Sequence, residues 1–385
     1  MSKQILGFGL FSVSFLTSFS LYIFPSPIQP HVLAFGELFQ KDAQASVVNA
    51  ITPVVVEETV RAPILSVEKF DTFDPESLSW SSVGSEVPWG PRDSAATFVF
   101  HDRMWIMGGL NGNDAPTTKE HAVLYSDAEY FHDAWSSSNG DEWKLESKNI
   151  PWLPRRSMTV VPFHDALWMF GGWSPTKGYL NDVWRSEDGI TWNRVSTTSP
   201  WTVREGHVAF EYKDKLWLMG GVDYDTRTLK NDVWSSSDGI VWEEVTSNAT
   251  WSPRWDHAVA VYKDALYLAG GMNLKKDTFR DVWRSEDGLT WELLTKTPEW
   301  SSRQGHGLLV FHDLMWLVGR LNDDIGGGIN DVWFSSDGIE WEKTTEDPVW
   351  IGREDHGTLV FDNALYVLGG MGSDWKWLND VWRGE

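Results

Sequence analysis

The sequence predicts an all-β protein built from one repeated four-stranded unit. Three observations support this: a tryptophan motif recurs at a near-constant interval, paired glycines follow it, and a tight-turn dipeptide follows the glycines. The opening tryptophans are separated by 63 residues in the first interval and by 49 or 50 in the others: Trp89, Trp152, Trp201, Trp251, Trp300 and Trp350. A period of this length indicates a ring or array in which each repeat is one small sheet.

Each repeat contains four short apolar runs separated by turn residues. The second run ends at paired glycines in five copies, and the fifth copy has Gly319-Arg320 instead. Asp-Gly, as at Asp188-Gly189, or Asn-Gly, at Asn139-Gly140, separates the third and fourth runs. These dipeptides accept positive φ and suit the twist of a tight hairpin. We therefore expect four antiparallel strands, a to d, in each repeat.

An isolated fourth strand precedes the first repeat. Each fourth-strand tryptophan stands nine residues before the next opening tryptophan, and Trp80 stands nine residues before Trp89. The chain ends just after a third strand, at residues 379–385. If residues 78–83 complete the last sheet, the ring has no unpaired seam. The sequence thus predicts a six-bladed β-propeller over residues 73–385, with the last blade closed by an N-terminal strand.

An uncharged apolar segment, residues 4–24, precedes the propeller. At 1.5 Å per residue, about twenty helical residues span about 30 Å, the thickness of a bilayer core. We interpret residues 1–24 as an N-terminal hydrophobic helix, either an uncleaved membrane anchor or a signal peptide. Lys3 precedes the segment and favours export of the remainder. Residues 25–72, with five prolines, are expected to form a linker, and the propeller is expected outside the cytoplasm.

Composition excludes several classes of function. Lysine and arginine total 32 against 55 aspartates and glutamates, a net charge of −23 that repels nucleic acid. The chain has no cysteine, so disulfides, thiolate zinc ligands and thiol nucleophiles are excluded. Four histidines stand one per repeat without local ligand spacing: His207, His257, His306 and His356. We therefore expect neither a metal site nor a cofactor, and we expect a monomer.

Paired glycines followed by two spaced aromatics resemble Kelch repeats, as in Gly171-Gly172, Trp184 and Trp192. The resemblance covers residues 78 to 383, although the family usually has tyrosine where this chain has Trp184. It implies a Kelch-type propeller, and most such propellers are binding platforms. The chain is more distantly similar to the galactose oxidase propeller and to a six-bladed bacterial N-acetylneuraminate epimerase. The cysteine-crosslinked tyrosine of the oxidase copper site is excluded here because there is no cysteine.

An arginine stands three residues after every opening tryptophan, and in four copies a histidine follows it by three. These residues begin strand a, on the face that carries the d–a and b–c connections, which we call the top face. They either bind carbonyls and carboxylates between blades as scaffold or face a ligand. Kelch repeats commonly carry this arginine and histidine, which favours the scaffold interpretation. The candidates for ligand contact in this group are Arg204, Arg254, Arg303, Arg353, His207 and Glu205.

Side chains that depart from the repeat are stronger candidates for function. Four tryptophans fall outside every register and are expected on the top face: Trp173, Trp255, Trp375 and Trp377. The long b–c loop of the first repeat adds Tyr125 and Tyr130. Acid–base candidates near the channel mouth are Asp93, Glu205, Asp256, Glu354 and Asp355.

Exposed aromatics around polar groups suit either a glycan or a protein partner, and they can also simply pack loops against blades. We expect a binding module for a glycan or protein ligand at the top face. The alternative is a carbohydrate-active enzyme, such as a sialic-acid epimerase or mutarotase or a lyase. Such an enzyme would use arginine at the substrate carboxylate and glutamate or histidine as base.

Overall fold

The computed structural model describes residues 73–385, except residue 86, residues 116–124 and residues 323–326. The expected hydrophobic helix at residues 1–24 and the linker at residues 25–72 lie outside the described residues. In the part that is described, no helix has both the length and the apolar character needed to cross a membrane. The helical elements there are two short 3-10 turns, η1 (Pro75–Ser77) and η2 (Tyr125–Asp127).

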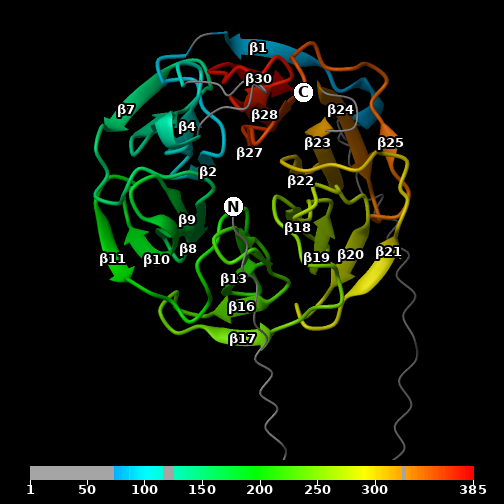
Figure 1. The fold of residues 1–385 in the computed structure, drawn as a ribbon. Helices are drawn as coiled ribbons and strands as arrows, with labels where there is room; N and C mark the ends of the chain where they lie inside the picture. Colours follow the sequence, from blue (N-terminus) through cyan, green and yellow to red (C-terminus); the bar gives the residue numbers. More distant parts are fainter. Residues whose placement is uncertain (1–72, 86, 116–124, 323–326) are drawn as a thin grey trace, which may run out of the picture. The chain divides into compact units, whose positions relative to one another are not determined.

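Six four-stranded antiparallel sheets surround a central axis, so the predicted all-β, six-bladed propeller is confirmed (Figure 1). The inner strands, one per blade, contact one another around the axis. They are β2 (Ala96–Phe100), β8 (Thr159–Phe163), β12 (Val208–Tyr212), β18 (Ala258–Tyr262), β22 (Gly307–Phe311) and β27 (Gly357–Phe361).

Two further strands follow each inner strand outward. The second strands are β3 (Arg103–Met107), β9 (Ala166–Ser174), β13 (Lys215–Met219), β19 (Ala265–Ala269), β23 (Leu314–Asn322) and β28 (Ala364–Leu368). The third strands are β6 (Ala134–Ser137), β10 (Gly178–Ser186), β16 (Val233–Ser236), β20 (Val282–Ser285), β24 (Gly327–Ser335) and β30 (Val381–Gly384).

The outermost strands of the first five blades are β7 (Trp143–Ser147), β11 (Trp192–Ser196), β17 (Glu243–Thr246), β21 (Glu292–Thr295) and β25 (Glu342–Lys343). In the sixth blade the outermost strand is β1 (Trp80–Gly84), which pairs antiparallel with β30. Trp80 lies opposite Gly384, and Ser82 lies opposite Trp382. The first and last described strands therefore belong to one sheet.

Three two-stranded sheets complete the strand inventory of the described residues. They are β4 (Leu110–Asn111) with β5 (Glu129–Tyr130), β14 (Val222–Asp223) with β15 (Thr228–Leu229), and β26 (Arg353–Glu354) with β29 (Met371–Gly372). Each is formed at least partly by a b–c loop, so these sheets lie at the top face. They hold the loops whose side chains form the candidate site.

The repeat arginines join three strands within each blade. Arg254 donates from Nη1 to Asp281 Oδ1 at 2.6 Å and to the Gly270 carbonyl at 2.7 Å, and from Nη2 to Asp281 Oδ2 at 2.9 Å. The Trp283 indole donates to the same carboxylate at 2.7 Å. All six blades repeat this arrangement, which completes the hydrogen bonding of the buried arginine and of the glycine carbonyl. The expected bonds between blades are thus bonds within one blade.

Neighbouring blades pack through the Asp-Gly turns. Gly239 has φ 72°, and a Cβ at this position would lie 2.3 Å from the Trp168 ring of the preceding blade. The turn aspartate is satisfied locally, because Asp238 Oδ1 accepts from the amides of Ile240 and Val241 at 2.8 Å. Glycine is required here both for the turn and for the close approach of the indole.

Candidate functional site

A ring of backbone surrounds the axis where the inner strands begin. Its six members stand two residues after each repeat arginine and all have φ between 49° and 60°: Ser94, Ser157, Gly206, Asp256, Gly305 and Asp355. Backbone hydrogen bonds connect neighbouring members; for example, the amides of Ser157, Ser94 and Asp355 donate at 2.9 Å to the carbonyls of Ser94, Asp355 and Gly305. We call these six residues the neck ring. Left-handed backbone is costly at serine and aspartate, so the ring is held by its surroundings.

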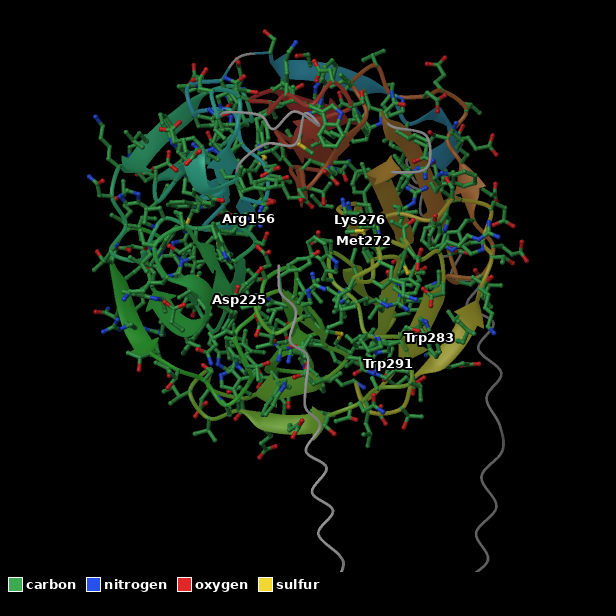
Figure 2. All side chains as sticks on the ribbon, viewed as in Figure 1. Arg156, Asp225, Met272, Lys276, Trp283 and Trp291 are labelled. Atoms are coloured by element: carbon green, nitrogen blue, oxygen red, sulfur yellow. The ribbon has the colours of Figure 1, made fainter. Side chains whose placement is uncertain are left out.

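Two cavities meet at the neck ring. The mouth cavity, of about 340 Å³, lies toward the b–c loops, and the channel cavity, of about 240 Å³, lies toward the histidines. Ser94, Ser157, Asp256 and Asp355 line both. In Figure 2, Arg156 lies on one side of the central opening and Met272 and Lys276 lie on the other, whereas Trp283 and Trp291 lie farther out in their blade.

The residue immediately after each repeat arginine supplies much of the polar lining. In chain order these residues are Asp93, Arg156, Glu205, Trp255, Gln304 and Glu354. Arg156 forms a two-point ion pair with Glu205, with distances of 3.0 Å and 3.2 Å. Gln304 Nε2 donates to Glu354 Oε2 at 2.9 Å. These pairs join adjacent blades directly at the mouth.

Arg156 and Gln304 were not predicted from the sequence, although four residues at the same position of the other repeats were: Asp93, Glu205, Trp255 and Glu354. A signal was available in the repeat itself. The arginine is identical in all six copies, whereas the residue after it changes from copy to copy. A position that varies inside an otherwise constant motif is freed from the scaffold, and such positions are candidates for function.

Burial raises the pKa of several carboxyl groups and tyrosines of the candidate site. Burial raises the pKa of Asp355 to about 6. Burial, and then repulsion from Asp355, raises the pKa of Asp93 and of Asp256 well above the ordinary value. Burial together with nearby carboxylates also raises the pKa of Tyr125 and of Tyr224. The site is therefore a region of negative potential, which disfavours ionisation of its carboxyl and phenol groups.

Four aromatic side chains line the mouth cavity: Tyr125, Tyr224, Trp255 and Trp375. The Tyr224 and Trp255 rings meet edge to face with centroids 5.4 Å apart. Trp375 is 55% exposed, and Tyr125 is 39% exposed. Three of these four were predicted from the sequence to face a ligand: Tyr125, Trp255 and Trp375.

Trp173 and Tyr130 lie behind this lining. Their ring centroids are 5.5 Å apart, and the Tyr130 hydroxyl donates to the Tyr125 carbonyl at 2.9 Å. The Arg156 guanidinium lies 4.7 Å from the Tyr125 ring centroid and 5.3 Å from that of Trp173. Trp173 therefore positions Arg156, and Tyr130 positions Tyr125.

Several expected site residues occupy other environments. Trp377 is only 3% exposed and packs with Leu110 and Met371, so its assignment as a ligand-facing aromatic is corrected to a core role. Four of the repeat arginines proposed for ligand contact are fully buried in the blade scaffold and do not reach the cavity: Arg204, Arg254, Arg303 and Arg353. In the folded chain, each guanidinium has its hydrogen-bond partners within its own blade.

Two further expected residues lie at the cavities. Glu205 lines the mouth cavity, paired with Arg156. His207 lines the channel cavity with His257, His306 and His356. Burial lowers the pKa of His207 to about 3, so its imidazole is neutral at physiological pH. Among the described residues, no group of three or more histidines, aspartates and glutamates is arranged to hold a metal ion.

The fold and site define a six-bladed propeller with a polar, aromatic-walled cavity at one end of its axis. The KLHDC2/KLHL20/DRC7 Kelch-repeats domain model matches residues 126–320, and the Kelch motif model matches residues 352–383. This chain therefore belongs to the Kelch-repeat family, whose propellers generally act as binding or interaction modules.

Solved structures agree on the fold. The structure of YjhT is similar with a TM-score of 0.60 and 17% sequence identity, over 78% of this chain and 96% of the YjhT chain. At this identity the likeness shows the fold alone. No curated protein matches the sequence significantly.

Proposed function

We propose that this protein is an exported or membrane-tethered Kelch-repeat binding module whose mouth cavity binds a carbohydrate. The observation that carries the proposal is the combination of four aromatic side chains with amide and carboxyl groups around one cavity. Sugar C–H faces pack on aromatic rings, while hydroxyls bind polar groups of the kind that Glu205 and Gln304 provide. The volume of about 340 Å³ suits one or two sugar units. The export part of the proposal rests on the apolar segment at residues 4–24.

A glycan array with the full-length protein tests this proposal. For any glycan that binds, Trp255→Ala with Tyr224→Ala should weaken binding at least tenfold, because the apolar wall is lost. Ile240→Ala with Val241→Ala is the matched control, since both side chains are exposed in the β16–β17 turn at the other face. The proposal fails if the array shows no glycan binding, or if both double variants weaken binding equally.

A second candidate, a sugar-active enzyme, is favoured by one observation. The pKa of Asp355 is raised to about 6 by burial, and a carboxyl group poised near neutrality suits general acid–base chemistry. NMR of sugar anomerisation with the wild type and with Asp355→Asn separates the two functions. Turnover that disappears in the variant supports an enzyme, whereas an unchanged anomerisation rate across acidic and neutral sugars excludes this candidate for those sugars.

A further inference from the structure

The mouth cavity carries more carboxyl groups than cations. Glu205, Asp256, Glu354 and Asp355 line it, and buried Asp93 interacts with Asp355 from the next blade. Of the lining residues, the cations are Arg156, already paired with Glu205, and Lys276, which is exposed. Figure 2 shows these two on opposite sides of the central opening. The excess of carboxyl groups disfavours an anionic ligand.

Gln304 gives an independent indication of what the cavity binds. Gln304 lines the mouth cavity, and only 7% of its surface is exposed. Its amide nitrogen donates to Glu354, but its carbonyl oxygen is buried and has no hydrogen-bond partner among the described residues. A buried acceptor without a partner is costly, so this oxygen is matched to a donor that a ligand would bring.

The aromatic wall favours the same kind of ligand. The faces of aromatic rings attract cations, and Trp255, Tyr224 and Trp375 line the cavity with the carboxyl groups. An ammonium group has three donors and no acceptor, which complements acceptor groups beside aromatic rings. A neutral sugar hydroxyl would satisfy Gln304 but would leave the excess carboxyl charge unbalanced.

We propose that the ligand of the mouth cavity carries a positively charged amino group, and that the cavity selects amino sugars over neutral and acidic sugars. This inference rests on the proposed function, because it names the ligand class for the same site. The ammonium group interacts with Asp256, Asp355 and the Gln304 carbonyl oxygen. It adds a second cation beside the neck-ring carboxyl groups, where Arg156 is already paired with Glu205.

Binding of such a cation is linked to protonation of the neck ring. Asp355 faces Asp93, Asp256, Glu205 and Arg156, and burial raises its pKa to about 6. Because the cation favours the ionised carboxylate, its affinity should fall as the pH is lowered from 6.5 to 5. Protonation of the amino sugar itself increases as the pH is lowered, so a fall in affinity over that range reports the protein.

Isothermal titration calorimetry of the full-length protein at pH 6.5 tests the inference with three probes: a glucosamine tetramer, its N-acetylated counterpart and tetragalacturonate. We expect the glucosamine tetramer to bind at least tenfold more tightly than the other two. If the N-acetylated or the acidic tetramer binds equally or better, the charge inference is wrong while carbohydrate binding stands. If none of the three binds and the glycan array is also negative, both proposals fall.

Matched variants test the residues. Asp355→Asn and Asp256→Asn keep the side-chain size, and asparagine accepts their φ values of 50° and 49°. Each should lower the affinity for the glucosamine tetramer at least tenfold, and by a larger factor than the affinity for the N-acetylated tetramer. The control is Asp264→Asn, with φ 59° in the turn at the opposite end of β18 from Asp256. Unchanged glucosamine affinity in both neck-ring variants, with folding verified by circular dichroism, would overturn the inference.

Discussion

Arg204 and Asp232 form a two-point ion pair within the third blade, with both nitrogen–oxygen distances at 2.7 Å. The arginine side chain is fully buried, and the aspartate side chain is 14% exposed. The Trp234 indole shares the carboxylate at 2.8 Å. This geometry joins strands a, b and c of the blade, and it recurs around the ring.

Removal of one partner should therefore be severe. Asp232→Ala leaves the Arg204 guanidinium buried without its counter-charge, and we expect a loss of about 3–5 kcal/mol in the free energy of unfolding. Arg185→Ala is the matched control, because Arg185 and Glu187 form an exposed pair that should contribute at most about 1 kcal/mol. Chemical denaturation of both variants checks this. Equal losses would show that the buried pair has no special structural role.

Gly239, in an Asp-Gly turn, and Gly178, at the start of β10, separate two effects of a glycine substitution. Gly239 and Gly178 have φ of 72° and 74°, so alanine strains the backbone at both. A Cβ on Gly239 would lie 2.3 Å from the Trp168 ring, whereas on Gly178 the nearest atom is 3.7 Å away. We expect Gly239→Ala to cost about 1–3 kcal/mol more than Gly178→Ala, from overpacking between blades. Thermal or urea unfolding of the pair measures the difference.

The buried histidines predict acid lability. Burial lowers the folded-state pKa of His257 to about 3 from an ordinary 6.5, so the unfolded chain binds a proton that the folded chain refuses. The stability from the neutral imidazole is fully present above pH 6.5 and is lost as the pH falls toward 3.

His257→Met tests this, because the second repeat already carries Met158 at the equivalent position. Between pH 6 and 4 the variant should lose about 1.4 kcal/mol less stability per pH unit than the wild type. The reciprocal Met158→His should steepen the dependence. Denaturation curves at several pH values measure both slopes, and an unchanged slope in His257→Met would contradict the buried neutral histidine.

Asp355 should have the opposite dependence. Its folded-state pKa of about 6 exceeds the ordinary 3.8, so its contribution is most favourable below pH 3.8 and is lost as the pH rises through 6. Asp355→Asn should therefore stabilise the protein above pH 7 by about 1–3 kcal/mol relative to its effect at pH 4. Urea unfolding at pH 7.5 and pH 4 measures the difference. A variant that destabilises equally at both would contradict an ionisation cost at the neck ring.

The amino-acid sequence by itself determined the blade number, the four-stranded unit and three of the four aromatic residues that line the mouth cavity. These features are local, because an Asp-Gly turn and an alternating apolar run direct the same backbone wherever they occur. These features are also repeated, so each copy of the unit supports the interpretation of the other copies. Trp255 and Trp375 could be identified because they break that repetition.

The tertiary structure alone decided which polar residues meet. Arg156 and Glu205 are 49 residues apart, and Asp93 and Asp355 come from opposite ends of the propeller sequence; they interact only because their blades are neighbours in the ring. Burial likewise assigned Trp377 and the repeat arginines to the scaffold, since identical side-chain chemistry serves structure or binding according to what surrounds it. That surrounding is set by packing between blades, which no single repeat encodes.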